Sequence, residues 1–409
     1  MSEDRRVIHY EPIPAKTLLM QIKNLSELMV NLAYCSIFFG DKDVTSEINR
    51  LEEKIDYLKS ILIMHAALAT RDRKDAERLV TILDFMIAVD KISDAAGDIA
   101  VLAENGISID IGLKDFFLNT STTLVYSLRV TAESIFANKR IDEIYGMIKE
   151  IFDVIAIRRN SEYILSPSKE IRVQPGDVLF IMGLAENIKT LLEKEGKAYP
   201  ARGIRGVEEG LVDLLLNIKD ISELMVDLGY SALFTHSREL AKELVSIEET
   251  IDRLTHEFKI LTMKSRELSD MEKIGMIEIA DACEAMGDAA MDMTFGLRKG
   301  LEPHPLIDEV LESTDERIAL IRVNEKMMDK NIRELGLDKY GIEILAMKRG
   351  EEWLVVPPST GLILKKGDIL LIRYYSEAEE HVSRIVSEEE REEIRRGIQE
   401  LEKEKINQD

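Results

Sequence analysis

The feature of this chain that most restricts its fold is an internal repeat. Residues 25–38 read LSELMVNLAYCSIF and residues 221–234 read ISELMVDLGYSALF, so that eight of the fourteen positions are identical at an offset of 196 residues. A repeat on this scale indicates that one structural unit is built twice. Four further pairs of segments match in the same order, namely 46–62 with 243–261, 93–100 with 283–290, 154–167 with 344–357, and 174–181 with 365–372.

The first part of each copy has the apolar spacing of long helices. Between about residues 15 and 105, and again between 207 and 300, apolar residues recur every three or four positions. This spacing places them on one side of an α-helix, and it predicts three long amphipathic helices in each copy. In the third helix of the first copy, the predicted apolar stripe consists of Ile82, Phe85, Val89, Ile92, Ala96 and Ile99.

The second part of each copy changes to short β-rich segments, over 123–182 and 317–374. Asn160 and Gly350 occupy equivalent places between two strand-like runs, and both residue types tolerate positive φ. We therefore expect a β-hairpin at each of them. A second turn, PGD in the first copy and KGD in the second, precedes the last predicted strand, and a helix is expected after it.

The composition excludes several classes of protein. A net charge of −23 argues against a chain that binds nucleic acid or lies on an anionic membrane. The N-terminal segment lacks the apolar core of a secretory signal, and no apolar stretch reaches the roughly 20 residues that a membrane span needs. The two cysteines, Cys35 and Cys283, stand at non-equivalent positions of the repeat, which argues against a duplicated disulfide. We expect a cytoplasmic protein without direct membrane insertion.

No combination of residues predicts catalysis. The sequence has no Gly-rich phosphate loop, no G-x-S-x-G and no H-E-x-x-H, and its six histidines have no counterparts in the other copy. We therefore expect a protein that is not an enzyme.

Acidic pairs in the helical part and a longer signature in the β-rich part resemble two known families. The helical segments resemble half of a PhoU-type domain, in which acidic residues four apart recur on the second and third helices. The β-rich segments resemble the TrkA-C module, the C-terminal ligand-binding subdomain of the regulators of potassium conductance. That signature is clearest in the second copy, as NIRELGLDKYGIEILAMKRGEEWLVVPPSTGLILKKGDILLIRY, whereas the first copy reads KRIDEIYGMI where the second reads NIRELGL.

These resemblances imply an α+β fold with two tandem copies of a PhoU-like three-helix unit, each followed by a small TrkA-C-type β/α module. The boundaries that we predict are 1–118 for the first helical unit, 119–196 for the first and more degenerate module, 197–206 for a linker, 207–315 for the second helical unit, 316–388 for the second module, and 389–409 for a charged tail.

The acidic pairs that match the PhoU motif are candidate metal ligands. Residues four apart on a helix lie on one face, so that each pair can share an ion, and carboxylates suit iron, manganese, magnesium or calcium. Helical geometry also places these acids opposite the apolar stripe, and the other interpretation is a solvated acidic face or a docking surface. The candidates are Glu52, Asp56, Asp94 and Asp98 in the first copy, and Glu248, Asp252, Glu284 and Asp288 in the second.

Two cations precede each predicted hairpin turn. Arg158 and Arg159 align with Lys348 and Arg349. Such cations can bind the phosphate oxygens of a small anionic effector, and relatives of the TrkA-C module bind effectors of this kind, including cyclic dinucleotides. The alternative is that the charges keep an edge strand soluble.

The resemblance implies a cytosolic, ligand-sensing regulator of monovalent cation (potassium) transport or of a related transporter. Its expected partner is a membrane cation transporter or channel, its TrkA-C-like modules are expected to bind the effector, and a homodimer is one candidate assembly. The alternative is a PhoU-type metal-binding signalling adaptor linked to phosphate transport.

Overall fold

The computed structural model describes residues 10–39, 42–105, 123–148, 152–160, 162–165, 167–196, 209–307, 316–337, 342–350, 352–355, 362–375, 378, 381, 382 and 384. It divides into two compact units, Met1–Val310 and Leu311–Asp409. The first unit contains the helices of both copies and the first β module, and the second contains the second β module. The predicted linker, 197–206, and the charged tail, 389–409, lie outside the described residues.

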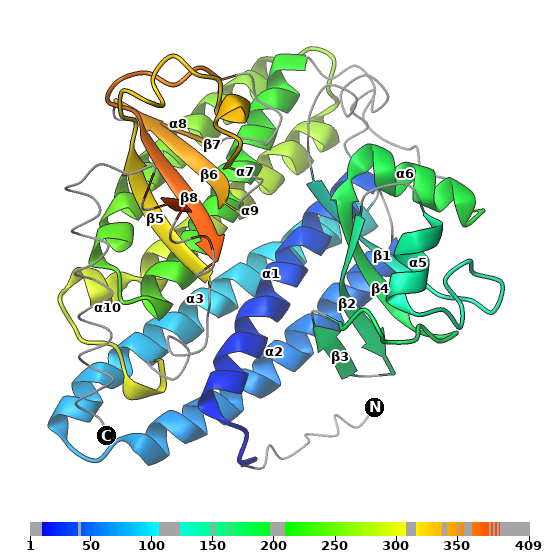
Figure 1. The fold of residues 1–409 in the computed structure, drawn as a ribbon, viewed down its shortest axis with the longest axis horizontal. Coiled ribbons are helices and arrows are strands. Elements are labelled where there is room, and N and C mark those ends of the chain that lie inside the picture. Colours follow the sequence, from blue (N-terminus) through cyan, green and yellow to red (C-terminus); the bar gives the residue numbers. More distant parts are fainter. Residues whose placement is uncertain are drawn as a thin grey trace. The chain divides into compact units, whose positions relative to one another are not determined.

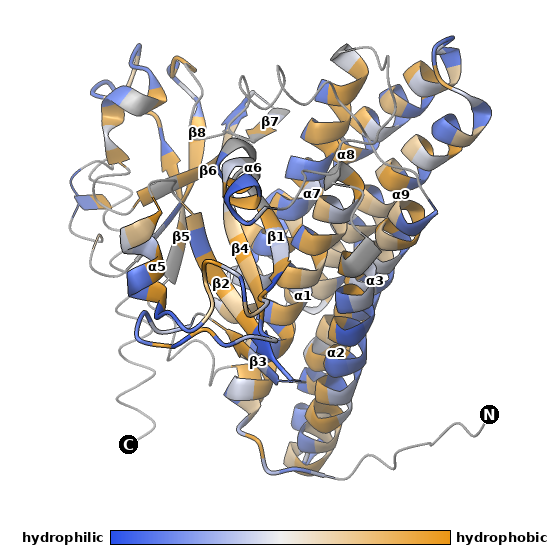
Figure 2. Ribbon diagram, turned by 90° about the vertical axis from the view of Figure 1, so that its right-hand side faces the viewer, coloured by the Kyte–Doolittle hydropathy of each residue, from blue (hydrophilic) through white to orange (hydrophobic). Residues whose placement is uncertain are grey.

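Each copy opens with three long helices, as the apolar spacing predicts. The stripe on the third helix of the first copy is buried along its whole length, from Ile82 to Ile99, and hydrophilic and hydrophobic residues separate onto different sides of α2 (Figure 2). The helices are α1 (Ala15–Phe39), α2 (Lys42–Ala69) and α3 (Arg73–Glu104) in the first copy, then α7 (Glu209–Phe234), α8 (Arg238–Lys264) and α9 (Asp270–Met293), followed by the short α10 (Phe295–Arg298).

Side-chain caps fix where three of these helices begin. The Asp72 carboxylate accepts hydrogen bonds from two backbone N–H groups at the start of α3. Ser237 caps α8, and Ser269 forms a capping box with Glu272 at the start of α9. These residues accept hydrogen bonds from N–H groups that have no partner inside the helix.

The two sets of three helices pack into a single bundle within the first unit. Helix α3 packs against α9, α1 packs against α2 and α3, and α7 packs against α8 and α9 (Figure 1). The ring of Phe85 on α3 contacts Tyr230 and Phe234 of α7, with centroids 6.0 Å apart in both pairs. The two helical units that the repeat predicts therefore share one core.

The first β module is a four-stranded antiparallel sheet with strand order β1-β4-β2-β3. Helix α1 contacts β1, so the sheet belongs to the same compact unit as the bundle. The elements are β1 (Thr123–Arg129), α5 (Ile141–Met147), β2 (Phe152–Arg159), β3 (Glu162–Leu165), β4 (Val178–Leu184) and α6 (Ala185–Lys194).

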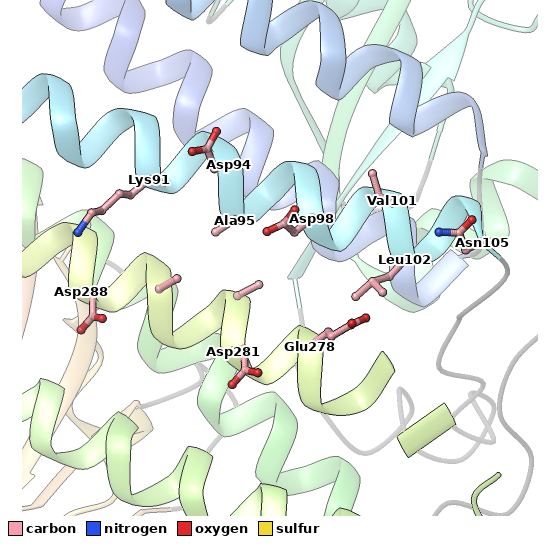
Figure 3. Close-up of a pocket in the computed structure, with 12 residues that line it drawn as sticks. Lys91, Asp94, Ala95, Asp98, Val101, Leu102, Asn105, Glu278, Asp281 and Asp288 are labelled. Carbon is pink, nitrogen blue, oxygen red and sulfur yellow. The ribbon is translucent and has the colours of Figure 1, made fainter. Parts of the chain in front are cut away.

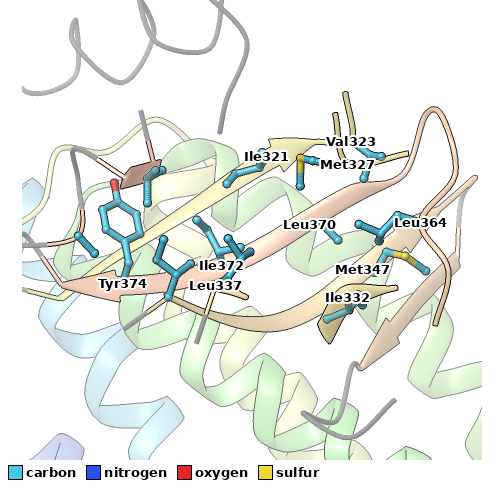
Figure 4. Packing of buried hydrophobic residues seen from close by; sticks show 13 residues of the cluster. Ile321, Val323, Met327, Ile332, Leu337, Met347, Leu364, Leu370, Ile372 and Tyr374 are labelled. Carbon is cyan, nitrogen blue, oxygen red and sulfur yellow. The ribbon is translucent and has the colours of Figure 1, made fainter. Parts of the chain in front are cut away.

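The second β module repeats this topology, with strand order β5-β8-β6-β7. Its register is equivalent, since Ala156 pairs with Leu165 and Ala346 pairs with Val355, and a bulge precedes Ala156 and Ala346 alike. A cluster that includes Ile321, Leu370 and Ile372 forms its core (Figure 4). The elements are β5 (Glu316–Arg322), the 3-10 helix η1 (Ile332–Leu335), β6 (Ile342–Arg349), β7 (Glu352–Val355) and β8 (Ile369–Tyr375).

The turn predictions are confirmed in both modules. Asn160 and Gly350 have φ of 57° and 65°, and each joins the two strands of a hairpin. In the second turn, Gly176 and Gly367 both have φ of 94°, two residues before the start of the last strand. The predicted α+β class is confirmed, with helices and β modules in the same order in each copy.

Within the part of the chain that the structure describes, no helix combines the length and the apolar character that crossing a membrane requires.

Candidate functional site

A groove of about 730 Å³ runs between α3 and α9. The two helices are antiparallel, since Lys91 contacts Asp292 at one end of the groove and Leu102 faces Glu278 at the other. Ala95, Ala282 and Ala285 line it between the helix axes. Figure 3 shows Asp94 on the side of α3 away from α9, and Asp281 and Asp288 on the side of α9 away from α3. The groove therefore has a floor of small apolar side chains and margins of carboxylates.

Carboxylates of neighbouring helices repel one another around this groove. Burial, followed by the charges of Asp252 and Glu284, raises the pKa of Asp288. Burial and the charges of Asp56 and Asp94 likewise raise the pKa of Glu52. Keeping these carboxylates ionised therefore costs free energy in the folded protein.

Most of the predicted acidic residues lie close enough for their charges to interact: Glu52, Asp56 and Asp94 on α2 and α3, and Glu248, Asp252, Glu284 and Asp288 on α8 and α9. Asp98 lines the groove. Burial and the charges of Asp252 and Asp288 raise the pKa of Glu248, as happens to Glu52 in the first copy. One lysine neutralises part of the charge in each copy. Lys59 pairs with Asp56 and with the neighbouring Asp90, and Lys259 pairs with Glu284 and with the neighbouring Asp281.

A metal site at these acids stays a prediction. No group of three or more His, Cys, Asp or Glu side chains among the described residues is arranged to hold a metal ion. A bound ion would therefore require these carboxylates to move closer together.

The second cation of each predicted effector pair clamps the hairpin to the Gly-Asp turn. The Arg159 guanidinium donates to both carboxylate oxygens of Asp177, at 2.9 and 2.8 Å, and to the Arg172 carbonyl. Arg349 donates in the same way to Asp368, at 2.9 and 2.6 Å, and to the Ile363 carbonyl. Both aspartates are almost fully buried. This repeated ion pair gives the PGD and KGD motifs a structural role.

The first cation of the pair differs between the copies. Arg158 is buried and forms a bidentate ion pair with Glu47 of α2, with both N–O distances 2.6 Å. It therefore fixes the first β module to the helical bundle. The equivalent Lys348 lies with its Nζ 5.7 Å from the ring centroid of Trp353, which is itself buried and anchors the second hairpin. An anion bound at the four predicted cations would compete with Glu47, Asp177 and Asp368, and effector binding there stays a prediction.

Sequence reasoning missed the polar contacts that join the two copies in the bundle. The Tyr34 hydroxyl lies 2.7 Å from Ser222 Oγ, and the Tyr230 hydroxyl bonds to Ser26. The repeat offset of 196 maps each pair onto the other with the partners exchanged. The sequence does contain a signal for these contacts, because the serine and the tyrosine are each identical in the two copies.

A lysine accompanies each tyrosine, and Lys219 is buried. The Nζ of Lys219 lies 5.2 Å from the ring centroid of Tyr34, and that of Lys23, its counterpart, lies 5.8 Å from that of Tyr230. Lys219 forms an ion pair of 2.7 Å with Glu223. Burial alone would lower the pKa of Lys219, but Glu223 and Asp220 outweigh this effect and raise it, so the lysine stays charged inside the bundle.

Models of two protein families match the chain. The TrkA-C domain model matches residues 125–196 and again residues 317–387. The PhoU domain model matches residues 215–294, which cover most of α7, α8 and α9. A search of curated proteins finds no match.

Three solved structures are similar to this chain at low scores. PhoU from Pseudomonas aeruginosa is 13% identical over 73% of this chain and 96% of its own, with a TM-score of 0.38. The GsuK RCK domain is 14% identical over 64% of this chain and 63% of its own, with a TM-score of 0.18. The GsuK channel bound to NAD is 14% identical over 64% of this chain and 52% of its own, with a TM-score of 0.19. Scores this low do not establish a common fold. The TrkA-C model matches the chain twice and the PhoU model matches it once. The chain therefore combines two TrkA-C domains with a PhoU domain.

Proposed function

We propose that this protein is a cytosolic, ligand-sensing regulator of potassium transport, or of a related transporter, and that its TrkA-C domains bind the effector. The observation that carries this proposal is the presence of two TrkA-C domains beside a PhoU domain in one chain. Both are regulatory rather than catalytic domain types, which supports a role in control rather than chemistry.

The proposed mechanism is a shift between conformations. An effector changes the state of a regulator only if it binds one arrangement more tightly than the other. In the first copy, the buried pair between Arg158 and Glu47 couples the sheet to α2, so a change at the module reaches the helices directly. The helices then present a different surface to a membrane cation transporter or channel.

The effector that we propose is a small anion such as a cyclic dinucleotide. In the second module, the cation that we expect to contact it is Lys348, which comes directly before Arg349 at the hairpin turn. The lysine ammonium is a compact point charge on a flexible side chain, which suits contact with a phosphate group.

The alternative proposal is a PhoU-type signalling adaptor that binds a divalent metal at the acidic pairs and is linked to phosphate transport. The raised pKa values of Glu52, Glu248 and Asp288 favour it, because a bound cation would relieve the repulsion that contributes to these shifts.

Titration calorimetry of the full chain separates the two. We expect cyclic dinucleotides to bind the unmodified protein and to bind Lys348→Gln at least fivefold more weakly, while Lys366→Gln, which removes an exposed cation from the same module, binds normally. If Mn²⁺ binds stoichiometrically and no nucleotide or other small anion binds, the adaptor replaces the ligand-sensing regulator.

A further inference from the structure

The groove between α3 and α9 has the shape and chemistry of a helix-binding surface. Its floor of Ala95, Ala282 and Ala285 presents no long side chain, so that the backbone of another helix can approach closely. From Lys91 to Asn105 the lined part of α3 spans about 21 Å, the length of roughly four helical turns. The floor alone would accept many apolar partners, and the charges decide among them.

Three carboxylates of the groove are available to a partner. Asp94, Asp98 and Glu278 are exposed, and none of them forms a hydrogen bond or ion pair with another residue that the structure describes. Further along the groove, Asp281 is paired with Lys259, and Lys91 is paired with Asp292. The negative margins of the groove therefore exceed what the protein's own described cations neutralise.

Exposed apolar side chains lie in the groove at Val101 and next to it on α9. Val101 on α3 and Ile274 on α9 are about half exposed, and Met271 on α9 is 66% exposed. These residues recur at helical spacing with the acids, as Val101 follows Asp98 by three positions and Ile274 precedes Glu278 by four. A partner that matches the whole surface has one apolar side and cationic residues along both flanks.

We propose that this groove binds an amphipathic, Lys/Arg-rich helix from the cytosolic side of a membrane protein. This inference rests on the proposed function, which supplies a membrane transporter as the partner. Cytosolic loops of membrane proteins carry an excess of Lys and Arg next to their membrane spans, and this is the charge that the groove complements. The apolar side of the helix packs on the alanine floor, and its cations meet Asp94 and Asp98 on one side and Glu278 on the other.

The test uses the full chain and a labelled synthetic peptide of about 14 residues, with leucine on one helical side and lysine on the others. Fluorescence anisotropy measures its binding to three proteins: the unmodified chain, the groove variant Asp94→Asn/Asp98→Asn/Glu278→Gln, and a control variant Glu193→Gln/Glu249→Gln/Glu257→Gln. Both variants lose three exposed negative charges, but the control residues lie on α6 and α8, outside the groove. Circular dichroism verifies that both variants are folded. We expect this because the substituted side chains are exposed.

We expect the groove variant to bind the peptide at least tenfold more weakly and the control variant to change binding less than twofold, since three exposed ion pairs together amount to about a factor of ten. A scrambled peptide of equal composition is expected to bind several-fold more weakly. Equal losses in both variants, equal binding of the scrambled peptide, or displacement of the peptide by one equivalent of Mn²⁺ or of spermine would each overturn the proposal. If the unmodified chain binds the peptide but no cyclic dinucleotide, the ligand-sensing function is contradicted and the groove proposal stands. If it binds a cyclic dinucleotide but not the peptide, the groove proposal alone is contradicted.

Discussion

The hydroxyl of Tyr34 lies 2.7 Å from Ser222 Oγ, and the equivalents of these residues, Tyr230 and Ser26, form the same contact with the roles of the two copies exchanged. Such reciprocity is what a two-fold symmetric interface between identical subunits produces. Here the two subunits are joined in one chain. The segment that is repeated most faithfully in the sequence therefore supplies reciprocal contacts between the two copies.

Removing one hydroxyl tests this interface. We expect Tyr34→Phe to lower the free energy of unfolding by about 1 kcal/mol, the typical contribution of a buried hydrogen bond, and Tyr230→Phe to do the same. Urea denaturation followed by circular dichroism measures both. Tyr57→Phe, which changes a tyrosine of α2 outside this interface, serves as the control. An equal effect of the control would show that the Ser–Tyr pairs have no special role.

The buried ion pair between Glu47 and Arg158 should be costly to break. Glu47→Gln leaves the Arg158 guanidinium buried without its counter-charge, and we expect a loss of about 3 kcal/mol in unfolding free energy. Replacing both residues with Met should recover most of this loss, because a well-packed apolar pair avoids burying charge. Glu162→Gln, at the exposed pair with Lys54, should cost less than about 1 kcal/mol. If Glu47→Gln costs no more than Glu162→Gln, the pair does not fix the module to the bundle.

The first hairpin turn should accept glycine at Asn160 but not a β-branched side chain. Asn160 has φ of 57°, so Asn160→Gly should change stability by less than about 0.5 kcal/mol, whereas Asn160→Val should cost about 1–2 kcal/mol. Thermal unfolding monitored by circular dichroism measures the difference. Similar melting temperatures for the glycine and valine variants would mean that positive φ is not required at this position.

The pH dependence of stability reports the repulsion between acids at the groove. Burial and neighbouring carboxylates raise the folded-state pKa of Asp288 above its unfolded value, so the folded protein binds this proton more tightly. Stability then falls as the pH rises from the unfolded pKa, about 3.9, through the folded one. Asp288→Asn should therefore be more stable than the unmodified chain at pH 7, by roughly a few tenths of a kcal/mol given the exposure of this surface, and the gain should vanish at about pH 3.

Urea titrations at several pH values check this prediction. Glu193→Gln, which removes an exposed charge from α6, is the matched control. A destabilised Asp288→Asn at pH 7 would show that Asp288 stabilises the fold through a favourable interaction instead.

The sequence predicts the elements of this protein better than it predicts their partners. Local spacing is sufficient for the three helices of each copy, and the residue types at Asn160 and Gly350 are sufficient for the two hairpins, because each is decided within a few residues. The apolar stripe from Ile82 to Ile99 is buried as expected. Periodicity shows which side of a helix is apolar but not which element covers it, and so the joining of both helical units into one bundle could not be predicted from it.

In the candidate site, too, local features could be predicted from the sequence but contact partners could not. The exposed acids at Asp94 and Asp98 follow from helical geometry, and so does their position opposite the apolar stripe. Two cations before a turn predict an anion-binding role for Arg158. Its carboxylate partner, Glu47, lies 111 residues away in the chain, and only the folded structure places the two together.

Control of cation transport by this protein can be measured directly in cells. Rubidium uptake, as a tracer for potassium, and phosphate uptake are compared between the source organism and a strain that lacks the protein. The strain is complemented with the unmodified chain or with Lys348→Gln. We predict that the deletion changes rubidium uptake at least twofold, that only the unmodified chain restores it, and that phosphate uptake is unaffected. A change in phosphate uptake with normal rubidium uptake would contradict the account and support the metal-binding adaptor.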